Sequence, residues 1–201
     1  MRIKARLYLA AFAVLAAGGC APKSATETET PPNIVAAPTA EIAEPEVVSQ
    51  PHPKRLPVIA NDIKADHIIV DKSDRTLVLF HAGKEIARYS DIRFGDAPAG
   101  HKQFEGDERT PEGRYTISGR NSGSRYHLSL RISYPNNADR KYANAHGQSP
   151  GGDIFIHGQP NGYTGAPLAR DWTDGCIAVS NAEIEQIWNV VPDGTEIIIQ
   201  P

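Results

Sequence analysis

The chain has 201 residues, of which 22% are charged, and a formal net charge of −3 at pH 7. This length suits one ordinary domain with appendages and is too short for two sizeable cores. No basic run follows the first six positions, so nucleic acid is not expected as a partner.

The first twenty residues have the pattern of an export signal. Arg2, Lys4 and Arg6 precede an apolar run at positions 7–17, and small residues follow that run. The run is well short of the roughly 20 residues that a permanent membrane-spanning helix needs. The pattern therefore predicts an exported protein.

The sequence LAAGGC, which ends at Cys20, resembles a bacterial lipobox, in which the cysteine is lipidated and becomes the mature N-terminus. Ala17 stands where that motif usually has leucine, so cleavage by the ordinary signal peptidase stays open as the alternative. Lipidation at Cys20 would anchor the protein stably, because several acyl chains hold far better than one. Ala21 follows the cysteine where an inner-membrane lipoprotein would have Asp, and this resemblance favours the outer membrane, facing the periplasm.

Residues 21–65 are rich in Pro, Ala, Thr and Glu and show no sustained helical or alternating apolar period. Such a composition predicts an extended, disordered tether between the signal (1–20) and a folded domain (66–201). Together with a lipid anchor, the tether would let the folded domain work at a distance from the membrane, where the cell wall lies. A merely solvated linker is the simpler alternative.

Residues 66–201 have the pattern of a mainly β fold, which we expect to be a single sandwich-like or barrel-like domain. Short β-branched runs separated by polar turns predict strands in HIIVDKSDRTLVLF, EIARYSDI, GRYTIS, HLSLRISYP, GGDIFIHG and TEIIIQP. One amphipathic helix is clear, because Ser180 and Glu183 form a capping box before apolar residues at helical spacing. The segment 136–152 is expected to be a long loop, serving either as a substrate lid or only as a connection.

Cys176, in the stretch DWTDGCIA just before this helix, is one of only two cysteines. If Cys20 is lipidated or removed, Cys176 has no disulfide partner in the chain and is either buried and inert or reactive. Asp174 and Gly175 indicate a tight polar turn, whose main-chain N–H groups can stabilise an oxyanion.

A thiol nucleophile also needs a base. His157 is the best placed of the seven histidines, because it ends the predicted strand DIFIHG and because Gly158 after it permits close approach of a substrate. A histidine at a strand end is, taken alone, more often structural. His146 has a similar His-Gly context in a loop and a weaker claim, and the remaining histidines are expected to be solvated or packed.

Taken together, IHGQP and the later DWTDGCIAVSN resemble the L,D-transpeptidase catalytic (YkuD-type) domain, whose signature is HG, a short gap and S/T-x-G-C before an apolar residue. Thr173, Gly175, Cys176 and Ile177 match this signature, and TPEGRYTIS at 110–118 matches the family's upstream TPxGxF/Y stretch. SYPN and GGDIFIHG are similar to the branch that acts on the lipoprotein–peptidoglycan link. The resemblance covers about residues 66–201.

The resemblance implies that Cys176 attacks the carbonyl of a meso-diaminopimelate residue in a peptidoglycan stem peptide, at its bond to the following D-residue. His157 would be the proton acceptor and donor, and Thr173 would orient the loop or the base. Main-chain N–H groups near Asp174, Gly175 and Cys176 would hold the oxyanion. The acyl-enzyme would pass to an amine, giving a cross-link or an attached protein, or to water, giving hydrolysis or release of a wall-attached lipoprotein. This chemistry requires no cofactor and no metal.

Many members of the family carry arginine two residues after the cysteine, where this chain has Ala178. The missing cation leaves recognition of a substrate carboxylate unassigned and favours the branch with hydrolytic or protein-releasing members. Arg131, Arg170 and Arg114 are candidates to replace it, with a solvated surface charge as the plain alternative for each. The residues predicted to bind substrate are Gly158, Tyr134, Arg131, Arg170 and Trp172.

Three other interpretations remain to be weighed. A papain-like protease would place its cysteine before its histidine, which is the reverse of the order in this chain. A metal site built from His146, His157, Cys176 and Asp174 lacks the ligand spacing of known zinc motifs. A noncatalytic module that binds the cell wall would keep the fold without needing the cysteine and histidine.

Overall fold

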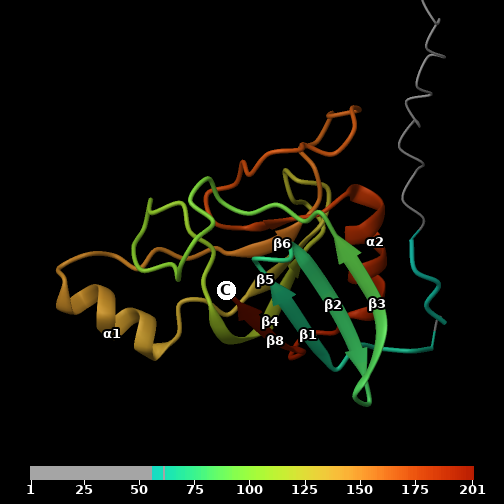
Figure 1. Cartoon of the computed structure of the whole chain (residues 1–201), viewed down its shortest axis with the longest axis horizontal. Coiled ribbons are helices and arrows are strands. Elements are labelled where there is room, and N and C mark those ends of the chain that lie inside the picture. Colours follow the sequence, from blue (N-terminus) through green and yellow to red (C-terminus); the bar gives the residue numbers. More distant parts are fainter. Residues whose placement is uncertain (1–55, 61) are drawn as a thin grey trace, which may run out of the picture. The chain divides into compact units, whose positions relative to one another are not determined.

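The computed structural model describes residues 56–60 and 62–201 (Figure 1). The predicted signal, the proposed lipidation at Cys20 and most of the predicted tether lie outside these residues. Over the described ranges, no helix has both the length and the apolar character needed to cross a membrane.

Three antiparallel strands begin the domain: β1 (His67–Asp71), β2 (Thr76–His81) and β3 (Lys84–Ser90). The β2–β3 hairpin closes with a two-residue turn, because His81 pairs with Lys84 across Ala82 and Gly83. Both turn residues have positive φ, 49° and 73°, as a type I′ turn requires. The strands expected in HIIVDKSDRTLVLF and EIARYSDI are thus confirmed.

Five further strands complete one eight-stranded sheet, in the order β3-β2-β1-β8-β4-β5-β6-β7. β8 lies parallel to β1, β7 lies parallel to β6, and the other neighbours are antiparallel. The bounds of these strands are β4 Gly113–Asn121, β5 Ser129–Ile132, β6 Phe155–His157, β7 Ile177–Ala178 and β8 Glu196–Gln200.

The sheet curls at β4. Residues 113–116 of this strand pair with β8, whereas the later residues pair with β5 after a register shift between Ile117 and Gly119. A bulge of this kind bends a strand and increases its twist. The two halves of the sheet therefore face different directions around one apolar core, and the mainly β, barrel-like expectation is confirmed.

The core contains residues from every strand and from the helix that follows the cysteine. The alternation of strand side chains places one face of each strand inside, as with Ile68 and Val70 of β1, which are both fully buried. The largest fully buried side chains are Tyr89, Phe94, Ile68, Leu77, Leu79, Ile92, Ile117, Leu130, Ile132, Ile154, Ile156 and Ile177.

The helix after the cysteine is confirmed as α2 (Asn181–Val190). Its capping box forms as predicted: the Ser180 hydroxyl accepts a hydrogen bond from the Glu183 N–H at 3.3 Å, and the Ser180 N–H donates to the Glu183 carboxylate at 2.9 Å. Ile184 and Ile187 are fully buried, and the helix packs against β5 and β6.

A second helix, α1 (Asn137–Ala145), lies within the segment expected to be a loop, so that expectation was wrong. Asn136 caps the helix by accepting from two main-chain N–H groups, and Asp139 accepts from the Asn136 N–H at 2.8 Å. Asp139 also accepts from the Tyr115 hydroxyl and contacts His101, at 3.1 Å in each case. These contacts attach α1 to the start of β4, at the far side of the domain from β3 (Figure 1).

Candidate active site

The pairing of β6 with β7 brings Cys176 and His157 to one face of the sheet. Ile156 lies opposite Ile177, and His157 lies opposite Ala178. The two isoleucines are fully buried on the core side. Because successive strand residues point to opposite faces, His157, Ala178 and Cys176 share the other face. Cys176 and His157 line one cavity of about 570 Å³.

His157 is held as a neutral imidazole with one nitrogen free. Its Nδ1 lies 2.7 Å from the Gly158 carbonyl oxygen and donates to it, so Nε2 presents a lone pair. The rings of Tyr126 and Trp172, with centroids 4.6 and 5.5 Å from that of the imidazole, contact it. Burial lowers the pKa of His157 because it disfavours the imidazolium, and the Gly158 carbonyl offsets part of this effect. His157 can therefore accept a proton at neutral pH.

The Cys176 thiol is protonated in the same environment. Its Sγ donates to the main-chain carbonyl of Asp153 at 3.6 Å. Burial raises the pKa of the thiol to about 11, although the Phe155 N–H acts in the opposite direction. The site thus pairs a neutral thiol with a neutral imidazole, and proton transfer must accompany attack by the sulfur.

Thr173 organises the turn that carries the cysteine. Its hydroxyl donates to the Cys176 carbonyl at 2.8 Å and accepts from the Gly175 N–H at 3.2 Å. Thr173 was expected to orient either the loop or the base. Both contacts lie within the loop, so they support the first role. Because the Gly175 N–H is engaged by Thr173, the Asp174 and Cys176 N–H groups are the candidates to hold an oxyanion. Of the three donors expected from the sequence, Gly175 is thus the one already engaged.

Gly175 meets two structural requirements at once. Its φ of +118° is one that L side chains rarely adopt, and an added Cβ would lie 2.4 Å from the Arg109 carbonyl oxygen. The turn thus packs directly on the segment that precedes the TPEG motif. This contact brings the TPEG motif close to the turn that carries Cys176.

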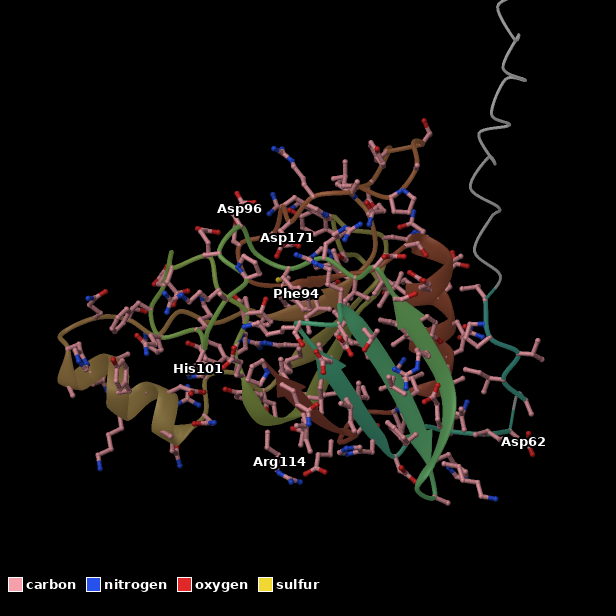
Figure 2. All side chains as sticks on the ribbon, viewed as in Figure 1. Asp62, Phe94, Asp96, His101, Arg114 and Asp171 are labelled. Carbon is pink, nitrogen blue, oxygen red and sulfur yellow. The ribbon has the colours of Figure 1, made fainter. Side chains whose placement is uncertain are left out.

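The segment before Cys176 is anchored by contacts that span much of the chain. The Asp171 carboxylate accepts two hydrogen bonds from Arg75, at 2.7 and 2.8 Å, and one from the Phe94 N–H at 3.0 Å (Figure 2). The Trp172 and Thr173 N–H groups both donate to the Phe94 carbonyl at 3.1 Å. Burial alone would raise the pKa of Asp171, but the Arg75 and Phe94 hydrogen bonds outweigh it and lower the pKa.

Three residues predicted to bind substrate lie elsewhere or have another role. Tyr134 is only 2% exposed, and its hydroxyl donates to the Pro150 carbonyl at 2.8 Å, so it supports the core. A Cβ on Gly158 would lie 2.6 Å from the Asn181 side chain, so this glycine makes room for α2 rather than for a substrate. Arg170 is exposed and outside the cavity that holds the thiol.

The other two predicted contacts, Trp172 and Arg131, lie near the thiol. Trp172 lines the cavity with Cys176 and His157. Arg131 lines a second cavity of about 800 Å³, which adjoins the first at Gly152, Asp153 and Asp174 and extends toward α1. Its guanidinium is paired with Asp153 at 2.7 Å.

Two residues of the site were missed from the sequence, Arg125 and Tyr126. Both line the cavity with Cys176 and belong to the connection between β4 and β5. Their neighbours in the sequence resemble an ordinary turn before a strand, so no local pattern marks them. In the described part of the chain, no group of three or more His, Cys, Asp or Glu side chains is arranged to hold a metal ion.

Residues 65–199 match the family model of the L,D-transpeptidase catalytic domain, YkuD. The chain therefore belongs to this family, and its mainly β fold and its cysteine and histidine agree with that assignment. It is 31% identical over 142 residues to YafK of Escherichia coli (strain K12), which is named as an L,D-transpeptidase. This alignment covers 67% of the chain and 50% of YafK, so the chain spans about half the length of the curated relatives it matches.

Among solved structures, the chain is similar to the helical cell shape determining protein Pgp2 of Campylobacter jejuni. The TM-score is 0.54 at 29% sequence identity, over 69% of this chain and 48% of Pgp2. The K307A mutant of Pgp2 gives the same TM-score at 28% identity, over 72% of this chain and 49% of the mutant.

Proposed function

We propose that this protein is a cysteine-dependent enzyme that acts on peptidoglycan stem peptides, at the bond between meso-diaminopimelate and the following D-residue. The observation that carries the proposal is the placement of Cys176 and His157 on one sheet face, lining one cavity. Membership of the L,D-transpeptidase family supports the class of substrate.

In the first half-reaction the Cys176 sulfur attacks the carbonyl carbon while His157 Nε2 takes the thiol proton. The Asp174 and Cys176 N–H groups would donate to the oxyanion that forms. The intermediate then collapses, the carbon–nitrogen bond breaks, and Nε2 returns its proton to the leaving amine. A thioester of the stem peptide on Cys176 is the product.

In the second half-reaction an amine or a water molecule attacks the thioester. His157 Nε2 removes a proton from the attacking group, and the same proton then restores the thiol as the carbon–sulfur bond breaks. An amine acceptor makes the enzyme a transpeptidase that builds a cross-link or attaches a protein. Water makes it an L,D-carboxypeptidase or an amidase that releases a wall-attached lipoprotein.

The position two residues after the cysteine favours hydrolysis as the second candidate. Ala178 is 1% exposed and exchanges two main-chain hydrogen bonds with Arg93, at 2.8 and 2.9 Å. The position therefore contributes only a methyl group where many relatives have a cation. An acceptor bound through that cation would be held less well in this chain, which leaves the thioester open to water.

We also propose that the protein works in the periplasm, anchored to the outer membrane through a lipid on Cys20. The export pattern and the lipobox-like LAAGGC support this placement. Cys20→Ser should abolish the incorporation of labelled palmitate into the protein in the producing bacterium. Palmitate labelling of the Cys20→Ser protein at the level of the unaltered chain would contradict the anchor.

Mass spectrometry of purified sacculi incubated with the chain from residue 21 onward tests the reaction. New cross-links or exchanged D-amino acids would identify a transpeptidase, and trimmed stem peptides or released protein would identify a hydrolase. Cys176→Ala should abolish every one of these products. Full turnover by the Cys176→Ala protein would overturn the proposal.

A further inference from the structure

One charged side chain of the active-site cavity has no role in the steps above. Arg125 lines the cavity with Cys176 and His157 and is exposed to solvent. Within residues 62–201, its guanidinium forms no hydrogen bond or ion pair, whereas other arginines near the site are engaged. These are Arg75 with Asp171, Arg93 with the Leu168 carbonyl and Arg131 with Asp153.

The main chain at Arg125 is fixed relative to His157. Asn161, four residues after His157, donates from its N–H to the Arg125 carbonyl and from its side-chain amide to the Ser124 carbonyl, at 2.9 Å in each case. The Gly158 N–H donates to the Tyr126 carbonyl at 3.0 Å. The segment that carries Arg125 is therefore bonded to the segment that follows the base, so the guanidinium extends from a fixed frame.

The unpaired arginine of the cavity, rather than its net charge, points to an anionic group on the ligand. Among the described residues that line it, Arg125 is the lone lysine or arginine. The carboxylates are Asp153 and Asp174, and Asp153 is already paired with Arg131. An arginine with free donors matches a carboxylate well, because its planar fork can donate two parallel hydrogen bonds.

The reaction determines which carboxylate can reach Arg125. His157 must return its proton to the leaving nitrogen, so the residue that leaves lies on the His157 side of the thiol, within this cavity. If that residue is a terminal D-amino acid, its free carboxylate is on the carbon bonded to the leaving nitrogen. The carboxylate thus enters the cavity whose unpaired cation is Arg125.

We propose that Arg125 is a specificity-determining residue that binds the free carboxylate of the D-residue leaving Cys176. This inference rests on the proposed function and deepens it, because it assigns the residue of this chain that would recognise the free end of the substrate. Arg114, a candidate from the sequence, is paired with Glu196 and lies on the opposite side of the domain from Asp171 (Figure 2).

The experiment compares two peptides and four proteins. The peptides are L-Ala-γ-D-Glu-meso-diaminopimelate-D-Ala with a free terminal carboxylate and the same peptide ending in D-alanine amide. The proteins are the chain from residue 21 onward and its Arg125→Gln, Arg125→Glu and Arg88→Gln variants. Arg88 lies on β3, at the other edge of the sheet, and pairs with Glu85 on the surface. Chromatography of the products gives kcat/KM for each pair.

Arg125→Gln should lower kcat/KM for the acid about tenfold to a hundredfold, the range of a lost hydrogen-bonded charge, and leave the amide nearly unchanged. Arg125→Glu should reverse the preference, so that the amide becomes the better substrate. Arg88→Gln should behave as the unaltered chain. Equal losses on both peptides, or no loss on either, would overturn the role of Arg125.

The failure of the proposed function is separable from the failure of this inference. If the unaltered chain turns over neither peptide, the proposed function is wrong and the role of Arg125 is overturned with it. If the unaltered chain turns over both peptides and Arg125→Gln treats them alike, only the role of Arg125 is wrong.

Discussion

The two ends of the sheet are stabilised in different ways. At the β3–β2–β1–β8 end, strands of five to seven residues pair in long ladders, with one register shift between β2 and β3, and bury many apolar side chains. At the β6–β7 end the strands have only three and two residues; His157 ends β6, and Cys176 immediately precedes β7. The segment before Cys176 is held by contacts from distant residues, such as those of Arg75 and the Phe94 N–H with the Asp171 carboxylate.

This difference separates the determinants of stability from those of activity. Loss of one apolar side chain at the β3–β2–β1–β8 end should lower the free energy of unfolding without altering the site. Loss of one polar contact at the β6–β7 end should misplace the reacting groups while most of the core stays intact. Four substitutions or titrations test this separation, beginning with the one of largest effect.

His157→Gln removes the proposed proton acceptor while keeping a polar side chain of similar reach. We expect turnover of the tetrapeptide to fall about 10²- to 10⁴-fold, the usual contribution of a general base. The melting temperature should change little, because the ladder between β6 and β7 uses main-chain atoms. Steady-state kinetics and thermal unfolding of the same preparation measure both, and turnover within threefold of the unaltered chain would contradict the assignment.

Ile197→Ala tests the β3–β2–β1–β8 end. Ile197 is fully buried on β8, between β1 and β4, so its truncation leaves a cavity in the core. We expect the free energy of unfolding to drop by about 2–5 kcal/mol, as for other large-to-small core changes. At a temperature where the variant stays folded, its kcat should match that of the unaltered chain. A large loss of kcat in the folded variant would contradict the claim that this end of the sheet determines stability and not activity.

Arg75→Gln tests the anchor of the segment before Cys176. The change removes two hydrogen bonds to Asp171 and leaves that partly buried carboxylate with the Phe94 N–H alone. We expect kcat to fall about tenfold, because small displacements of reacting groups have large kinetic costs. Arg88→Gln, which breaks a surface pair with Glu85, is the matched control. Equal kinetics for the two variants would show that the anchor does not position the site.

The smallest expected effect on turnover is its dependence on pH near neutrality, which is set by His157 and Cys176. Because the pKa of His157 is lowered, the imidazole should stay neutral and active down to below pH 6.5, and turnover should fall only under more acidic conditions. Because burial raises the pKa of Cys176 to about 11, alkylation by iodoacetamide should still be rising with pH between pH 7 and pH 10. A plateau of the alkylation rate at neutral pH would instead indicate a preformed thiolate–imidazolium pair.

The sequence was informative where structure follows from local patterns. The β-branched runs predicted the strands, and the Ser180–Glu183 capping box predicted the start of α2. The motifs around His157 and Cys176 predicted the two residues that now line one cavity. In each case the relevant residues are neighbours in the chain or belong to a recognisable spacing.

The sequence was uninformative where structure depends on distant contacts. α1 has no stripe of large apolar side chains, and it is attached through Asp139 to residues on other segments. The Arg75–Asp171 pair joins positions 96 residues apart. Arg125 reaches the cavity because Asn161 holds its main chain. None of these contacts corresponds to a local pattern or spacing of residues that could be recognised in the sequence.

The central claim is that Cys176 forms a thioester with the stem peptide. Mass spectrometry of the intact chain, quenched in acid during turnover of the tetrapeptide, tests this directly. We expect a mass increase equal to the tripeptide acyl group, located on Cys176 and absent from the Cys176→Ala protein. Turnover without that adduct at any quench time would contradict the thioester. An unchanged rate in the Cys176→Ala protein would also contradict it.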